Sequence, residues 1–237
     1  MKKSLYRAIL FLAFGLFCTG LLYSQEGQNM GRRDGFEFIG HASVKIITKD
    51  GVVIYIDPAF KGDYSQPADI ILVTHGHSDH NQVDLVTKKD DTKIITHAEA
   101  LIDGEYKTFG ILGVKITAVQ AYNARHNINE CVGYLLEYDG IKVYHAGDTS
   151  KTDQMAELGK IGLDYVFLPI DGVYNMDPAE ATECAEILNA KTYFPMHNDP
   201  RSSQTGEWYD TGMDDFKVKN KVILEPGNFF MYDFGSY

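Results

Sequence analysis

Hydrophobic positions along the chain fall into short runs that polar turns separate. The runs 44–48 and 52–56 flank Lys49-Asp50-Gly51, which is the pattern of a β-hairpin with a glycine turn. The run 70–74 is almost continuously apolar, as expected of a strand that is buried on both faces of a sheet. Similar runs predict strands at 93–96, 114–119, 132–138 and 142–144, and 138–140 forms the turn between the last two.

Helix signals lie between these strands. Asp177 has the position of an N-cap, Pro178 is the first helical residue and Glu180 is the third, so a helix should run to about Asn189. The segments 82–88 and 153–160 predict weaker helices. Strands that alternate with helices, after an early hairpin, indicate a mixed α/β protein.

The first residues of the chain have the pattern of a targeting segment. Three basic residues precede the apolar run 8–17, and a more mixed stretch follows to residue 24. A membrane anchor is the alternative, but this run is shorter than the roughly 20 residues that a spanning helix needs. We expect a signal peptide at 1–24, a polar linker at 25–33 and one domain at 34–237. The mature protein would then be periplasmic or secreted, without stable membrane insertion.

Charge and cysteine content limit the partners and the disulfides. The chain has 22 basic and 33 acidic residues, and loss of the basic leader would make its net charge of −11 more negative. Such a surface repels phosphate backbones, so we expect no nucleic-acid partner. Cys131 and Cys184 could pair in an oxidising compartment. Cys184, however, lies on the apolar stripe of the predicted helix at 177–189, which favours a buried free thiol.

The most informative segment is VTHGHSDHNQ at residues 73–82. His75 and His77 are two positions apart, so in an extended chain their side chains point the same way and can bind one metal ion. Asp79 and His80 follow, where the chain turns away from the strand. Imidazole combined with carboxylate suits zinc best, with manganese or iron as alternatives. A polar loop with incidental histidines would have to explain three histidines within six positions.

Three other predicted strands are each followed by a residue that can bind a metal ion. His126 comes a few residues after the strand at 114–119, Asp148 comes after 142–144, and His197 comes after the β-rich run 191–195. Ligand sites in α/β sheets favour the edge formed by the carboxyl ends of the strands. These residues are therefore candidates for the same metal centre.

Together these segments carry a resemblance to a known family. THGHSDH resembles the H-x-H-x-D-H motif of the metallo-β-lactamase superfamily. FIGHASVKI, VVIYIDPAF, VYHAGDTS, FLPIDGVYNMDPAEA and YFPMHN follow the order found in its broad metal-dependent hydrolase branch, which is similar to the L-ascorbate-6-phosphate lactonase group. The resemblance covers most of residues 36–230. It implies a four-layer αββα sandwich of the metallo-β-lactamase type with two divalent metal ions, and it says little about the substrate.

The resemblance also implies which residues bind the two ions. The first ion would be held by three histidines, the second by one aspartate and two histidines, and one aspartate would bridge them; in that order these are His75, His77, His126, Asp79, His80, His197 and Asp148. His126 is the least specific assignment, because it lies in a loop where Asn123 could compete. Asp148 and Asp79 would act in catalysis, Asp148 by holding the ions together and Asp79 by orienting the nucleophile.

The remaining candidates have supporting roles or none. Asp57, in IDPAF, resembles the family's buried aspartate that orients a metal-bound histidine, although it could instead cap the turn before Pro58. His41, in GHAS, would either support the metal floor, face the substrate or make a structural hydrogen bond. His145 shares a strand face with Val143, so we expect it to be structural. His97 is expected at the surface or in packing.

We therefore expect an exported dinuclear hydrolase, with zinc as the first choice of metal and a small molecule as its partner. The bond would be an ester, lactone, phosphoester or amide in a small-molecule or lipid-type substrate. Trp208 and Tyr209, in the polar stretch after His197, could contact that substrate or belong to a plain surface loop. The alternatives are a metal-binding module without catalysis and a di-iron redox protein on the same fold. The oligomeric state stays open.

Overall fold

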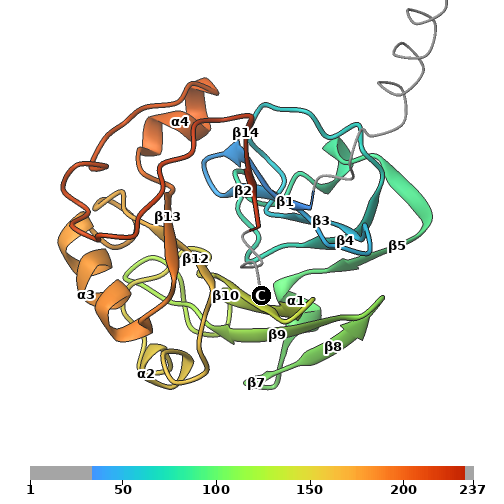
Figure 1. Ribbon diagram of the computed structural model, residues 1–237, viewed down its shortest axis with the longest axis horizontal. Helices are drawn as coiled ribbons and strands as arrows, with labels where there is room; N and C mark the ends of the chain where they lie inside the picture. The colour runs from blue at the N-terminus through green and yellow to red at the C-terminus, as the bar shows by residue number, and fades with distance from the viewer. Residues whose placement is uncertain (1–33, 233–237) are drawn as a thin grey trace, which may run out of the picture. The chain divides into compact units, whose positions relative to one another are not determined.

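Two six-stranded β-sheets form the centre of the computed structural model, which describes residues 34–232 (Figure 1). The N-terminal sheet has the order β14-β1-β2-β3-β4-β5, with bounds Asn228–Met231, Gly35–Gly40, Ser43–Ile47, Val53–Ile56, Ala68–Leu72 and Lys88–Ile95. The C-terminal sheet has the order β13-β12-β11-β10-β9-β8, with bounds Thr192–Met196, Tyr165–Pro169, Ile141–His145, Val132–Tyr138, Val114–Gln120 and Thr108–Ile111.

Both sheets change from antiparallel to parallel pairing along their width. β1, β2 and β3 pair antiparallel, whereas β3-β4 and β4-β5 pair parallel. In the second sheet β8 to β11 pair antiparallel, and β11-β12 and β12-β13 pair parallel. The carboxyl ends of neighbouring parallel strands meet at one edge of a sheet, so the loops that follow β4, β11, β12 and β13 can converge.

The main core lies between the two sheets. Phe36 of β1 packs edge-on against three aromatic rings of the second sheet, with ring centroids 5.0 Å away for Tyr165, 5.3 Å for Phe167 and 5.5 Å for Phe194. The inward residues of β2, β3, β4, β9 and β10 belong to the same buried cluster. The two sheets are therefore one packed unit, which fixes the position of the loops at their edges.

Helices cover the outer face of the C-terminal sheet. α3 (Pro178–Leu188) buries its apolar stripe there, next to α2 (Met155–Leu158). The Asp177 side chain caps α3 by accepting a hydrogen bond from the Glu180 amide at 2.8 Å, and the helix ends at Asn189 in a left-handed conformation. The helix expected from 177 to about 189 is confirmed. Cys184 is buried on its stripe, and Cys131 and Cys184 are both free thiols.

The outer face of the N-terminal sheet has a thinner cover. Tyr55, Ile71 and Val73 pack there against Tyr64 and Val86, which come from the loop after β3 and from the end of a short 3₁₀ helix, η1 (Val83–Leu85). The mixed α/β sandwich expected from the resemblance is confirmed. Its outer layer on this side is made by a 3₁₀ turn and loops within the described residues.

Two expectations about elements are wrong. The helix expected at 82–88 is reduced to η1, because Val83 and Val86 are three positions apart and one 3₁₀ turn brings both against the outer face of the sheet. β5 begins at Lys88 and not at 93, since a register shift between Ala68 and Ile70 admits an exposed polar stretch that hydrophobic periodicity does not reveal. The elements not foreseen are β1, β8, β12 and β14, α1 (His97–Ala100), β6 (Leu101–Ile102), β7 (Glu105–Tyr106) and α4 (Pro200–Thr205).

The expected signal peptide and linker lie outside the described residues. Among residues 34–232, none of the helices has the length and apolar character needed to span a membrane.

Candidate metal centre

Metal-capable side chains from both sheets meet where the strands end. The segment after β4 supplies four of them, the β1–β2 turn supplies one, and the loops after β9, β11 and β13 supply one each; in that order they are His75, His77, Asp79, His80, His41, His126, Asp148 and His197. All are buried except His77, which is exposed, and Asp79, which is half-buried. The seven ligands expected from the resemblance are thus brought together, and His41 joins them.

Three overlapping groups have potential ligand atoms within 4.8 Å of one another. They are His75, His77 and His126; His75, His80 and Asp148; and His41, Asp79, His80 and His197. The first group contains the three histidines expected at the first ion. The third contains the three residues expected at the second ion together with His41, for which the sequence indicated a supporting, substrate-facing or structural role.

The donor atoms in these groups fit a divalent metal ion. Nε2 of His41, His75, His80 and His197 and Oδ1 of Asp148 are buried and have no hydrogen-bond partner among the described residues. Buried polar atoms without partners cost free energy, and proteins seldom leave several side by side. Imidazole nitrogens beside a carboxylate are the ligand set that zinc and its neighbours in the first transition row prefer.

The opposite ring nitrogen, Nδ1, of His75 and of His80 has an acceptor, and this fixes where each ring keeps its proton. Asp57 accepts a hydrogen bond from His80 Nδ1 at 2.8 Å, and it also accepts from the amide and the hydroxyl of Thr74, each at 2.7 Å. Because Thr74 gives its only hydroxyl proton to Asp57, its oxygen must accept from His75 Nδ1, 3.1 Å away. Both rings therefore keep a proton on Nδ1 and can present an inward Nε2 lone pair to a metal ion, in His80 after the Nε2 proton is lost.

Two further side chains face the Nδ1 atoms of His126 and His197, which follow strands of the C-terminal sheet. The sequence did not assign this role to either of them. Asn123 donates from Nδ2 to Asn175 at 2.8 Å, so its Oδ1 faces His126 Nδ1 at 3.0 Å. Asn123 thus orients His126 and does not compete with it. Asp171 Oδ2 lies 3.0 Å from His197 Nδ1. Asp171 follows β12 as Asp148 follows β11. This position directly after a strand could have identified Asp171 from the sequence.

The backbone is held in uncommon conformations at the centre. His41, Asp57 and His197 have positive φ angles of 56°, 47° and 44°, a region that side-chain-bearing residues adopt at a cost of about 1–3 kcal/mol each. Gly147, directly before Asp148, also has a positive φ, and a Cβ there would lie 2.8 Å from the Val132 carbonyl oxygen. Such strain clusters at functional sites, where surrounding structure over-determines the chain.

Burial and mutual charge set the protonation of the centre. Burial opposes ionisation of Asp148, but the histidines around it, His197 and His80 foremost, hold its pKa below the usual range. Burial also opposes charge on His80, yet the carboxylates of Asp148 and Asp57 raise its pKa. Burial lowers the pKa of His75 to about 3. A bound cation would compete with the proton on His80, so metal binding should release protons.

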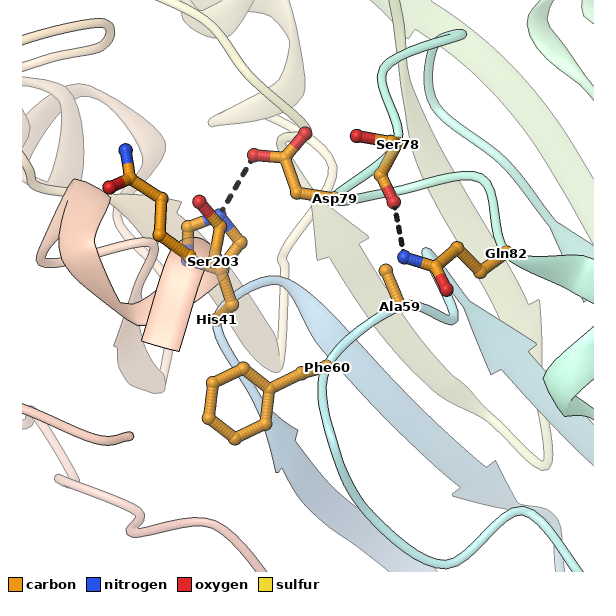
Figure 2. A pocket seen from close by; sticks show the side chains of 8 residues that line it. His41, Ala59, Phe60, Ser78, Asp79, Gln82 and Ser203 are labelled. Atoms are coloured by element: carbon orange, nitrogen blue, oxygen red, sulfur yellow. Dashed lines mark hydrogen bonds and ion pairs between the residues drawn. The ribbon is translucent and has the colours of Figure 1, made fainter. Parts of the chain in front are cut away.

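A cavity of about 220 Å³ opens beside Asp79 and His41 (Figure 2). It is lined by His41, Ala59, Phe60, Ser78, Asp79, Gln82, Ser203 and Gln204, none of which is a lysine or an arginine. Ser203 and Gln204 come from α4, within the polar stretch after His197. Trp208 packs partly buried against the core, and Tyr209 lies under the Arg201 guanidinium at 4.2 Å, so neither of these lines the cavity.

Two other histidines lie outside the three groups. His145 donates from Nε2 to the Ala42 carbonyl at 3.0 Å and accepts at Nδ1 from the Gly147 amide at 3.3 Å, so both ring nitrogens have structural partners. His97 is half-buried at the start of α1.

Comparison with known proteins agrees with this fold and centre. The model of the β-lactamase superfamily domain matches residues 36–197. A UPF0173 metal-dependent hydrolase from Thermococcus onnurineus is 31% identical over 219 residues, which cover 80% of this chain and 96% of the relative.

Solved structures show the same fold. A metallo hydrolase from Ignicoccus hospitalis superposes with a TM-score of 0.65 at 24% identity, over 86% of this chain and all of that one. A proposed zinc-dependent hydrolase of the metallo-β-lactamase superfamily from Thermotoga maritima has a TM-score of 0.57 at 28% identity, over 76% of this chain and 82% of that one. The chain therefore belongs to the metallo-β-lactamase superfamily and, within it, to the UPF0173 metal-dependent hydrolases.

Proposed function

We propose that this protein is an exported dinuclear hydrolase, with zinc as its metal, that cleaves an ester, lactone, phosphoester or amide bond in a small-molecule or lipid-type substrate. The observation that carries the proposal is the set of inward-facing histidine Nε2 atoms, whose Nδ1 atoms are held by acceptors and which surround one buried carboxylate. The names of the curated relatives support hydrolysis.

The position of Asp148 supports two ions rather than one. Its Oδ1 lies 3.4 Å from His80 Nε2, and its Oδ2 lies 3.4 Å from His197 Nε2 and 4.0 Å from His126 Nε2. One carboxylate oxygen thus faces a histidine assigned to the second ion and a histidine assigned to the first. An anion in this place offsets the repulsion between two close cations.

Divalent ions at such a centre polarise a carbonyl or phosphoryl oxygen and make water a nucleophile near neutral pH. The protein supplies the frame for this chemistry. Asp57, Thr74, Asn123 and Asp171 hold the rings so that Nε2 faces inward, and Asp148 contributes negative charge between the two groups. Asp79 lies on the cavity side, where it can accept a hydrogen bond from the nucleophile and orient it (Figure 2).

The lining of the cavity beside Asp79 restricts which chemical groups of a substrate can bind there. Its eight lining residues offer the hydroxyls of Ser78 and Ser203, the amides of Gln82 and Gln204, and the ring of Phe60, but no cation. Apart from the metal ions, an anionic group would find no counter-charge there, whereas a neutral group bearing hydroxyl or amide functions could exchange hydrogen bonds with the lining. This favours substrates whose portion next to the scissile bond is polar and uncharged.

Metal analysis together with a hydrolysis panel tests the proposal. Mature protein, loaded with zinc and dialysed, should hold two equivalents and cleave at least one ester, lactone, phosphodiester or amide in the panel. Two bound ions without turnover of any substrate class would indicate a metal-binding module. Iron retained through purification, with a visible spectrum that responds to reductant, would indicate the redox alternative.

Export is tested separately, by N-terminal sequencing of protein from the native envelope. We expect the mature chain to begin about 20–25 residues after Met1. Recovery of intact Met1 in a membrane fraction would favour an anchor.

A further inference from the structure

His41 lies at the meeting point of the two sheets. It occupies the turn between β1 and β2, and its carbonyl oxygen accepts a hydrogen bond of 2.8 Å from the backbone amide of His197, which follows β13. Gly40 precedes it with a φ of 136°, and a Cβ at that position would lie 2.3 Å from the Phe60 ring. The turn is therefore tightly fixed, and the imidazole of His41 has little freedom to move.

The hydrogen bonds of Ser202 settle which nitrogen of His41 carries the proton. Ser202 Oγ donates its only proton to the Asp199 carbonyl at 2.6 Å. Its contact with His41 Nδ1 at 2.8 Å must then be one in which the ring donates. Nε2 of His41 consequently bears a lone pair, and it is buried without a hydrogen-bond partner among the described residues. His75 is arranged in the same way by Thr74.

That lone pair faces three residues assigned to the second ion. His41 Nε2 lies 3.4 Å from Asp79 Oδ2 (Figure 2), and the His41 ring centroid lies 3.7 Å from that of His197. Ligand atoms of His41, Asp79, His80 and His197 are all within 4.8 Å of one another. Two atoms bound to one tetrahedral zinc ion at about 2.0–2.1 Å lie about 3.3–3.4 Å apart, whereas a good hydrogen bond is shorter.

We propose that His41 is a direct ligand of the second metal ion, alongside Asp79, His80 and His197. The inference rests on the dinuclear centre proposed above and goes beyond the ligand set that the sequence motifs imply. With the bridging Asp148 counted at both ions, the second ion would have five protein groups, whereas the first would have three histidines and Asp148. The position open to water or substrate then belongs mainly to the first ion, and His41 helps to hold the second ion in place.

Metal binding by variants of the full mature chain tests the inference. Wild type, His41→Ala, His41→Asn and the control His97→Ala are stripped with chelator and titrated with Co²⁺, and the visible d–d absorption is recorded with bound metal. Asn tolerates positive φ, so His41→Asn keeps the backbone of the turn if Ala disturbs it. Circular dichroism checks that each variant is folded.

We expect both His41 variants to bind the second equivalent at least about tenfold more weakly, with an altered d–d spectrum, while His97→Ala matches the wild type. If the folded His41 variants bind both equivalents with wild-type affinity and an unchanged spectrum, His41 is not a ligand, even if activity falls. Failure of hydrolysis in a wild type that binds two ions would overturn the proposed activity and leave this inference standing. If the wild type binds one ion only, the dinuclear centre fails and this inference fails with it.

Discussion

At the scale of single residues, the centre depends on which atom of each side chain faces inward. The H-x-H-x-D-H segment could be recognised because its ligands are contiguous and follow one strand. Ser202 and Asp171 could not be assigned in this way, because each contacts a ring that lies in another loop, and Asn123 was seen only as a possible competitor of His126. A pattern along the chain shows which residues can bind a metal, but the acceptors that orient them depend on the fold.

Asp148 gives the first prediction at this scale. Asp148→Asn keeps the size of the side chain but removes its charge and one good ligand oxygen, while the protein stays folded. We expect kcat/KM to fall by on the order of a hundredfold or more, roughly 2.7 kcal/mol of transition-state stabilisation. Kinetics on a substrate found by screening, with circular dichroism and metal content measured alongside, check this. A folded variant with near wild-type activity would show that Asp148 is not the bridge.

Asp171 gives the second prediction at this scale. Asp171→Asn leaves an amide that can still accept from His197 Nδ1, but without the anionic charge that steadies the ring. Replacing a partner of this kind typically costs about 10–100-fold in metal affinity or activity. Chelator competition should therefore show weaker retention of one equivalent in Asp171→Asn. Asp103→Asn, in an exposed turn, is the matched control, and equal affinities in the two variants would contradict the role.

At the scale of elements, hydrophobic periodicity revealed α3 and missed α4. α3 has an N-cap, a proline at its first position and a buried stripe, all of which are visible in the sequence. α4 has six residues, is capped by Asp199 and buries only Ser202, so it presents no apolar stripe to detect. The strands β1 and β12 overlap the start of segments quoted for the family resemblance, yet their short apolar runs were not separated from the motifs that follow them.

α4 carries the third prediction, because it supplies Ser203 and Gln204 to a cavity that has no lysine or arginine in its lining. Ser203→Arg should shift the ratio of kcat/KM values toward a substrate with a carboxylate near the scissile bond and away from its neutral analogue. A partly exposed ion pair is worth up to about 1 kcal/mol, so the shift should be about two- to fivefold. Ser203→Gln controls for size, and an unchanged ratio in Ser203→Arg would place the substrate elsewhere.

At the scale of the whole molecule, each proposed ion is held by both sheets. The N-terminal sheet and its loops supply His41, His75, His77, Asp79 and His80, and the C-terminal sheet supplies His126, Asp148 and His197. Metal binding and the packing of one sheet on the other are therefore coupled, and the ions bind the folded chain in preference to the unfolded one.

The fourth prediction follows from this coupling. An ion present at a hundred times its Kd stabilises the folded state by about 2.7 kcal/mol, so chelation should lower the Tm by roughly 5–10 °C for a domain of this size. Thermal unfolding with EDTA, and again after zinc is restored, measures the difference. In Asp148→Asn, the difference in Tm with and without metal should be smaller. An identical Tm with and without metal in the wild type would mean that the two sheets do not share the ions.

The pairing of β14 with β1 has a consequence for how this centre can be encoded. The register places Met231 opposite Gly35, so the first and last described strands are hydrogen-bonded neighbours and the path of the chain almost closes on itself (Figure 1). A short link across that gap, with new termini at the exposed Asp139–Gly140 turn, would give a circular permutant. The order of the segments in its sequence would change, yet every strand would keep its partners. The order of the motifs along the sequence thus depends on where the chain begins, whereas the metal centre requires only that the two sheets face each other.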